Sequence, residues 1–250
     1  MEYFLSTAAK KILIVSDVHQ DVDKLDKIIK YEDADINLCL GDWFDSHFYD
    51  SDAACEQTAI YLKNFVANPK NITLFGNHDL HYFFNNRYAY CSGYSNRKQD
   101  VIDQVFRKDK QEIISRFKWF TFVDEFLCTH AGLSRDFLSP IISSKESLCE
   151  YLHGQAQDCN IKLLSNLPHW FYGAGRSRGG SQNKGGLVWL DFDHEFGPIE
   201  GISQIVGHTY RKQYRVTRYR GTDNYCIDTN LHQWVTISNN NFQIGKYETT

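Results

Sequence analysis

The sequence predicts an α/β fold whose last third is rich in strands, and two observations support this. First, three strand-like runs alternate with two helical patterns within residues 11–76. Second, short strand-like runs replace helical patterns after a glycine-rich stretch at 173–186. Together they predict a mainly parallel sheet in the first half of the chain, followed by β-rich structure.

The first half supplies the repeated units. Residues 11–16 form a short, continuous apolar run, which is typical of a strand buried on both faces. Apolar residues at positions 22, 25, 28 and 29 have helical spacing and predict a helix over 21–31. By the same criteria we expect strands over 35–40 and 71–75, and between them a helix from Ser51 or Asp52 to about Ala67.

Beyond residue 76 the patterns are less regular. Residues 81–98 are aromatic and polar without a clean period, and we expect a loop there. The remaining expected elements are a helix over about 100–117, a hairpin over 119–129 that turns at 124–125, a helix over 145–164, strands over 186–192, 202–206, 213–220 and 225–228, and a hairpin over 234–247.

Composition limits the classes of function. The chain has 250 residues with 42% hydrophobic content, and no linker divides it, so we expect one domain over 1–250. The net charge of −4 gives no nucleic-acid footprint, and no apolar run approaches the roughly 20 residues of a membrane helix. The seven cysteines form no CxxC pair and are expected to be free, and the N-terminus lacks a secretory segment. We therefore expect a cytoplasmic protein; its oligomeric state is not predicted.

Polar side chains follow the ends of five predicted strands. Asp17 and His19 come directly after the first one, and residues two apart on an extended segment point to the same side. Open α/β sheets keep their sites beyond the carboxyl ends of strands. The other strand ends deliver Asp42, Asn77, His130 and His208, which makes six candidate ligands, and Asp45 and His78 follow in the same loops.

These residue types predict a metal centre. Carboxylate, imidazole and amide ligands together suit Mn²⁺, Fe²⁺ or Zn²⁺. Six such ligands are too many for one catalytic ion with an open position, so we expect two divalent ions, with Mn²⁺ preferred and Fe or Zn as alternatives.

Five motifs in this order resemble those of the calcineurin-like metallophosphoesterases, especially their bacterial serine/threonine protein phosphatase-like branch. They are DVH at 17–19, GDWFD at 41–45, GNHD at 76–79, HAGL at 130–133 and GHT at 207–209. The resemblance implies a four-layer α/β/β/α sandwich of two mixed β-sheets flanked by helices, with a dinuclear metal site at one edge.

The resemblance also implies a role for each residue. Asp17 and His19 would bind the first metal, Asp42 would bridge both, and the second metal would be held by Asn77, His130 and His208. His78 would protonate the leaving oxygen, with Asp45 orienting it. The implied reaction is hydrolysis of a phosphate monoester by in-line attack of a water or hydroxide that bridges two metal ions.

Two positions depart from the family pattern. Ser46 follows Asp45 where many members have an arginine that grips phosphate, and Tyr210 stands where many phosphodiesterases have a second histidine. The second departure favours the protein phosphatase-like branch. Arginines near glycines can contact phosphate bidentately, and the candidates for the missing contact are Arg178, Arg176 and Arg135.

Three functions stay open. The leading one is a phosphomonoesterase whose substrate is a phosphoprotein, a nucleotide or a small phosphomonoester. The second is a dinucleoside polyphosphate hydrolase or another nucleotide phosphoesterase, in which aromatic residues of 81–98 would stack on adenine instead of packing their own loop. The third is a non-catalytic scaffold, although the chain keeps every ligand and His78. We expect the acidic segment 191–195 to be a solvated turn, and His81 to be a surface or supporting residue.

Overall fold

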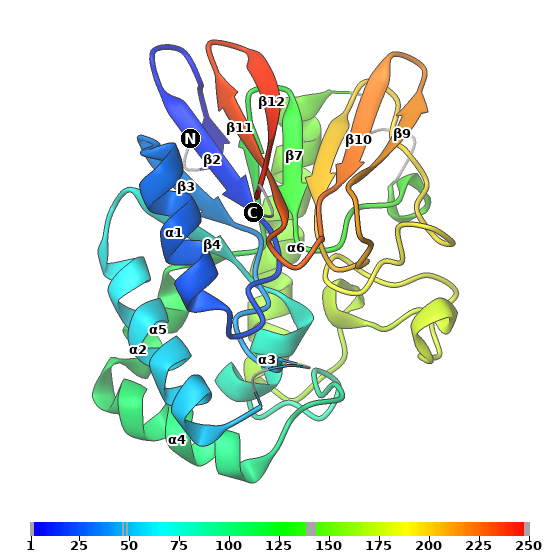
Figure 1. Ribbon diagram of the computed structural model, residues 1–250. Helices are drawn as coiled ribbons and strands as arrows, with labels where there is room; N and C mark the ends of the chain where they lie inside the picture. Colours follow the sequence, from blue (N-terminus) through cyan, green and yellow to red (C-terminus); the bar gives the residue numbers. More distant parts are fainter. Residues whose placement is uncertain (1–2, 47, 49, 139–143, 248–250) are drawn as a thin grey trace.

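Figure 1 presents the computed structural model of the chain, which describes residues 3–46, 48, 50–138 and 144–247. The described strands form two mixed sheets of six strands each. The first runs in the order β1 (Phe4–Leu5), β6 (Phe120–Val123), β7 (Phe126–Thr129), β8 (Ser203–Val206), β10 (Thr222–Cys226) and β9 (Arg215–Tyr219). The second runs β12 (Asn241–Lys246), β11 (Gln233–Ser238), β2 (Lys11–Val15), β3 (Ile36–Cys39), β4 (Asn71–Leu74) and β5 (Phe117–Lys118).

Alternate residues of the central strands enter two different cores. On β2, Ile12 and Ile14 belong to a cluster that also contains Ile205 of β8, so they fill the space between the sheets. Leu13 and Val15 point the other way, into a larger cluster that contains helix residues. This two-residue period explains why the strand is apolar throughout, because both of its faces are covered.

Helices flank the sheets. They are α1 (Val22–Glu32), α2 (Asp52–Ala67), α3 (Asn77–Phe83), α4 (Asn96–Phe106), α5 (Lys110–Ser115) and α6 (Lys145–Leu164). α1, α2 and α5 contact strands of the second sheet and lie along one flank of the molecule in Figure 1. α6 brings Leu148 and Leu152 to the cluster that holds Phe120 and Phe122 of β6. The predicted α/β sandwich of two mixed sheets flanked by helices is therefore confirmed.

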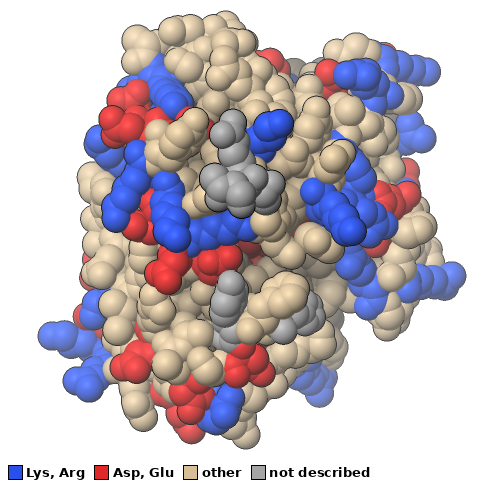
Figure 2. All heavy atoms as spheres, viewed as in Figure 1, with Lys and Arg blue, Asp and Glu red and all other residues tan. Residues whose placement is uncertain are grey.

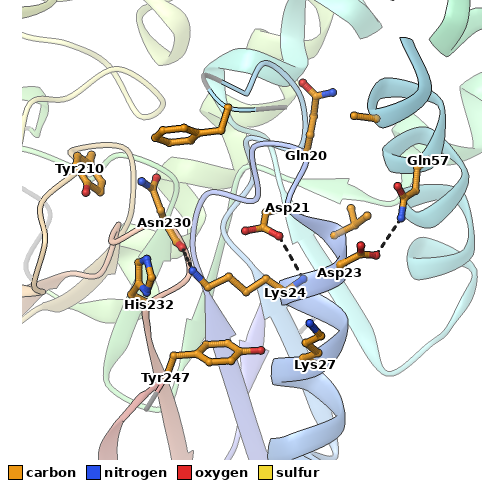
Figure 3. Close-up of a pocket in the computed structure, with 13 residues that line it drawn as sticks. Gln20, Asp21, Asp23, Lys24, Lys27, Gln57, Tyr210, Asn230, His232 and Tyr247 are labelled. Atoms are coloured by element: carbon orange, nitrogen blue, oxygen red, sulfur yellow. Dashed lines mark hydrogen bonds between the residues drawn. The ribbon is translucent and has the colours of Figure 1, made fainter. Parts of the chain in front are cut away.

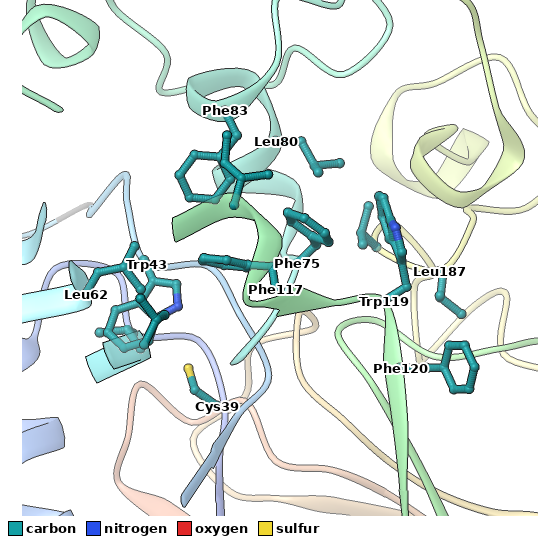
Figure 4. Packing of buried hydrophobic residues seen from close by; sticks show 14 of the residues in the cluster. Cys39, Trp43, Leu62, Phe75, Leu80, Phe83, Phe117, Trp119, Phe120 and Leu187 are labelled. Carbon is teal, nitrogen blue, oxygen red and sulfur yellow. The ribbon is translucent and has the colours of Figure 1, made fainter. Parts of the chain in front are cut away.

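An aromatic cluster lies beneath the loops that leave β3 and β4, as Figure 4 shows. The Phe75 ring is 4.7 Å from the Trp119 ring and 5.0 Å from the Phe117 ring, measured between centroids. Trp43 is fully buried, and its indole Nε1–H donates to Thr73 Oγ1 at 2.8 Å. Buried aromatic residues beside Asp42 and Gly76 give the two loops a rigid base.

Most expected elements are confirmed, with four corrections. The helix over 100–117 is two helices, α4 and α5, with a 3₁₀ turn over 107–109 between them. α3 spans Asn77–Phe83, so residues 81–83 of the expected loop over 81–98 are helical. The strands β1 and β5 were not predicted, since two residues carry no periodicity. The strand over 186–192 is wrong, because these residues form turns.

The last correction follows from the local backbone hydrogen bonds. The amides of Trp189 and Leu190 both donate to the Gly186 carbonyl at 2.9 Å, which closes a turn, and Gly186 itself lies against the Trp170 carbonyl oxygen, where a Cβ would collide. Leu187, Val188 and Leu190 are nonetheless fully buried. None of the helices in the described part of the chain is long and apolar enough to cross a membrane.

Candidate active site

The loops that follow β2, β3, β7 and β8 are joined at one edge of the sandwich. The His19 amide donates to the Asp42 carbonyl at 2.8 Å, which ties the loop after β2 to the loop after β3. The His208 amide donates to both carboxylate oxygens of Asp17 at 3.0 Å. The Gly207 amide donates to the His130 carbonyl at 2.6 Å.

Two groups of ligand atoms result, and they share one residue. Asp17, His19 and Asp42 form the first group, while Asp42, His130 and His208 form the second, with the ligand atoms of each group within 4.8 Å of one another. Asn77 Oδ1 lies 3.0 Å from His130 Nε2, which adds it to the second group. All six predicted ligands therefore meet in one place.

Backbone carbonyls set the tautomers of two imidazoles. His19 Nδ1 lies 3.1 Å from the Phe44 carbonyl oxygen, and His130 Nδ1 lies 2.9 Å from that of Leu40. A carbonyl oxygen can only accept, so each Nδ1 carries the hydrogen. In the neutral rings the Nε2 lone pairs then face Asp42, as metal-binding histidines require.

The converging atoms fit a divalent cation. His130 Nε2 is 3.3 Å from Asp42 Oδ2, and because Nδ1–H is donated to Leu40, this contact requires either a proton on Nε2 or a cation between the two atoms. Burial opposes protonation of His130, but the Asp42 carboxylate outweighs it and raises the pKa of His130 to about 9. His208 Nε2 is buried and has no hydrogen-bond partner among the described residues, while burial holds its pKa well below the usual range. A cation would satisfy both features.

Four site residues adopt left-handed backbone conformations. The φ angles are 43° at His19, 53° at Asp42, 62° at Asp45 and 66° at His208. Non-glycine residues seldom adopt such angles, which cost about 1–3 kcal/mol each and cluster at functional sites. The fold therefore holds these side chains where local backbone preference alone would not put them.

Two glycines let backbone segments approach the ligands. A Cβ on Gly207 would collide with Asp17 Oδ2, and a Cβ on Gly76 would collide with Asp42 Oδ1. In both cases the space next to the carboxylate exists only because the residue lacks a side chain.

We expect Gly207→Ala to weaken metal binding about 10–100-fold, because the new methyl group would displace the Asp17 carboxylate. Gly154→Ala is the matched control, since a Cβ at Gly154 in α6 meets no atom within 4 Å among the described residues. That variant should be stabilised by about 0.5–1 kcal/mol and keep its metal affinity. Calorimetric titration with Mn²⁺ measures both; equal affinities in the two variants would contradict the prediction.

Asp45 holds the predicted acid, His78, through a network of four side chains. His78 Nδ1 and His81 Nε2 lie 3.0 and 3.1 Å from Asp45 Oδ2. The Tyr82 hydroxyl and the Lys98 ammonium donate to Oδ1 at 2.6 and 3.1 Å. Burial favours the neutral acid, yet the hydrogen bonds from His78 and His81 hold the pKa of Asp45 well below its usual range. Asp45 thus stays a carboxylate that fixes His78 with Nε2 directed away from it.

Sequence reasoning missed two buried carboxylates. Asp79 accepts the amides of Trp43 at 2.8 Å and of Gly76 at 2.9 Å, which joins the loops after β3 and β4. Asp228 follows β10; burial and the Asp17 charge raise its pKa to about 8. The signal for Asp79 was its place in the GNHD motif, and the signal for Asp228 was the apolar run before it.

The acidic segment 191–195 is not a solvated turn, since Asp191 and Glu195 are buried at 6% and 4% exposure. Glu195 accepts the Gly185 amide at 2.7 Å and the Ser177 amide at 3.1 Å, so it fastens the glycine-rich loop. Asp191 Oδ2 pairs with Arg178 Nε at 3.0 Å. The expectation was wrong because the partners of these carboxylates come from another segment.

The three candidate arginines occupy different places. Arg178 donates from Nη2 to Thr209 Oγ1 at 3.0 Å, and its charge helps to lower the pKa of the adjacent His208. Arg176 is exposed on the same 3₁₀ turn. Arg135 is also exposed and donates to the Tyr219 hydroxyl on β9 at 3.2 Å.

The first aromatic residues after His81 pack into the protein core, and the later ones are exposed. Tyr82, Phe83 and Phe84 are buried, whereas Tyr88 and Tyr90 are 41% and 43% exposed. His81 is buried and supports Asp45, as described above.

Comparison with known proteins agrees with this geometry. Residues 10–212 match the model of the calcineurin-like phosphoesterase family, and the chain belongs to that family. It is therefore a phosphoester hydrolase, of a family that normally uses a dinuclear divalent metal site. No curated protein matches its sequence.

Solved structures share the fold at low sequence identity. A cold-active protein-tyrosine phosphatase of the psychrophile Shewanella sp. is 16% identical with a TM-score of 0.57, covering 98% of this chain and 80% of its own. A protein serine/threonine phosphatase from Saccharomyces cerevisiae, with similarity to human phosphatase PP5, is 13% identical with a TM-score of 0.58, covering 99% and 84%.

Proposed function

We propose that this chain hydrolyses phosphate monoesters, with His78 as general acid. The observation that carries the proposal is the position of His78 beside two ligand groups that share Asp42: its amide donates to Asp42 Oδ1 at 2.8 Å. When bound, two divalent ions would neutralise phosphoryl oxygens and lower the pKa of a water molecule. Mn²⁺ is the proposed metal, because the ligands mix carboxylate and amide oxygens with imidazole nitrogens.

We propose the following roles for the residues of the site. Asp17 and His19 would hold one ion, Asn77, His130 and His208 the other, and Asp42 both. His78 would hold a proton on Nε2 and give it to the leaving oxygen, an effect worth about 10²–10⁴ in rate. Asp45 would keep the imidazole oriented.

Ser46 stands where many family members have a phosphate-binding arginine. We propose that Arg178 binds the phosphate instead. We expect Arg178→Lys to raise KM about tenfold with a smaller change in kcat, because Lys loses the fork of donors. Arg176→Lys and Arg135→Lys are matched controls that should change KM less than about twofold. Steady-state kinetics with p-nitrophenyl phosphate give the three values, and a larger effect at either control position would reassign the contact.

The proposal is tested by assaying p-nitrophenyl phosphate, bis(p-nitrophenyl) phosphate and diadenosine tetraphosphate with Mn²⁺ and after chelation. The monoester should be turned over fastest, and only with metal. Faster cleavage of the diester or of the dinucleotide would replace the proposal with a phosphodiesterase or a dinucleoside polyphosphate hydrolase. No metal-dependent turnover of any of them would overturn it.

A further inference from the structure

A trough leads away from the proposed metal ligands in three connected compartments. The innermost, of about 40 Å³, is lined by Asp17 and His19. It shares Asp21, Phe48 and Asn230 with a middle compartment of about 720 Å³, which Figure 3 displays.

The trough continues past the middle compartment. Lys27 and Tyr247 line both the middle compartment and an outer one of about 350 Å³. The walls come from α1 on one side and from the C-terminal hairpin of β11 and β12 on the other. The whole trough is therefore elongated and begins at the catalytic edge.

Free positive charge lies along this trough. Lys27 and Lys246 have no ion pair or side-chain hydrogen bond within the described segments. The middle compartment also holds the carboxylates of Asp21 and Asp23, so the net positive charge lies in the outer compartment, whose described lining has Lys27 and Lys246 and no carboxylate. Figure 2 shows Lys and Arg side chains over α1 on this face, with Asp and Glu side chains between them.

The outer compartment is aromatic. Tyr31 is 78% exposed, and its ring lies 6.3 Å from that of Trp234, which in turn lies 5.8 Å from that of Tyr247. Trp234 is itself buried and fixed, because its Nε1 donates to Glu32 Oε1 at 2.5 Å. An exposed tyrosine above a fixed tryptophan offers a place for an apolar side chain.

We propose that this trough binds the segment of a phosphoprotein beside its phosphorylated residue, with acidic side chains near Lys27 and Lys246 and an apolar side chain against Tyr31. This inference rests on the proposed function and names its substrate class. Binding cavities of about 300–1,000 Å³ already enclose a drug-sized molecule, so a mononucleotide would be held by the middle compartment and leave the outer one empty. An extended peptide uses both.

The test compares a blocked phosphoserine with two phosphoserine peptides that carry Glu-Glu-Leu on the N-terminal or the C-terminal side. One extended peptide should have a kcat/KM at least about tenfold higher than the blocked amino acid. Lys27→Glu should remove most of that gain and leave p-nitrophenyl phosphate hydrolysis unchanged. Lys30→Glu is the matched control, because Lys30 pairs with Asp26 at 2.6 Å and lines neither large compartment.

A second measurement does not depend on turnover. The better peptide, made with a phosphonate in place of the phosphate ester, should bind about tenfold more weakly to Tyr31→Ala than to the wild type in fluorescence anisotropy. Equal binding, no gain from either extension, or equal losses in Lys27→Glu and Lys30→Glu would overturn the inference. The inference would also be overturned if Lys27→Glu weakened the binding of adenosine monophosphate but not the binding of the peptides. If p-nitrophenyl phosphate is hydrolysed in these cases, the proposed function still stands.

Discussion

His78→Asn is expected to slow the hydrolysis of phenyl phosphate about 10²–10⁴-fold, but that of 2,4-dinitrophenyl phosphate less than about tenfold. Phenolate is a poor leaving group that needs a proton as the P–O bond breaks, whereas dinitrophenolate leaves without one. The structure supports this difference because His78 Nδ1 is held 3.0 Å from Asp45, which leaves Nε2 free to donate.

Single-turnover rates on the two esters measure the effect. His153→Asn is the control, because His153 is exposed on α6 and contacts Tyr3 and Gln157 instead of the site. It should match the wild type on both substrates. Equal losses on the two esters in His78→Asn would mean that His78 acts in binding or folding, and the role of general acid would be withdrawn.

Asp42→Asn is expected to lower kcat/KM for p-nitrophenyl phosphate on the order of 10³-fold, because both ligand groups lose their shared negative charge. The fold should tolerate the change. Asn adopts the left-handed conformation readily, and Asp42 has a φ of 53°. The hydrogen bond from residue 42 to Asp79 comes from the backbone amide and is kept.

The metal-free Asp42→Asn variant should melt below the metal-free wild type but still unfold cooperatively, because the buried His130 imidazole loses the carboxylate that raises its pKa. Calorimetry separates this result from misfolding. Asp100→Asn, on the exposed face of α4, should change neither the activity nor the melting temperature. If Asp42→Asn kept kcat/KM within about tenfold of the wild type at saturating Mn²⁺, the two ligand groups would not depend on this carboxylate.

The convergence of the six proposed ligands could be predicted from the sequence because each of them follows an apolar strand within a few residues. The strands themselves are recognisable, and the carboxyl ends of parallel strands meet by geometry. Asp17, Asp42 and Asn77 all follow strands of the parallel part of the second sheet, so nearby sequence suffices to place them.

The remaining site residues depend on contacts between distant segments. Asp228 reaches Asp17 because β10 pairs parallel to β8, and nothing around residue 226 indicates that pairing. Glu195 and Lys98 bind partners ten and 53 positions away, respectively, at Gly185 and Asp45. Charged side chains give no hydropathy signal when they are buried by such partners, so an acidic run was expected in solvent.

The central claim is that two adjoining ligand groups share Asp42, and a titration with Mn²⁺ tests it most directly. Binding followed by calorimetry and by electron paramagnetic resonance should show two equivalents per wild-type chain with a spin-coupled signal at saturation. Asp42→Asn should bind fewer ions and lose the coupling. A wild-type chain that binds one isolated ion or none, or a variant that keeps the coupled pair, would contradict the claim.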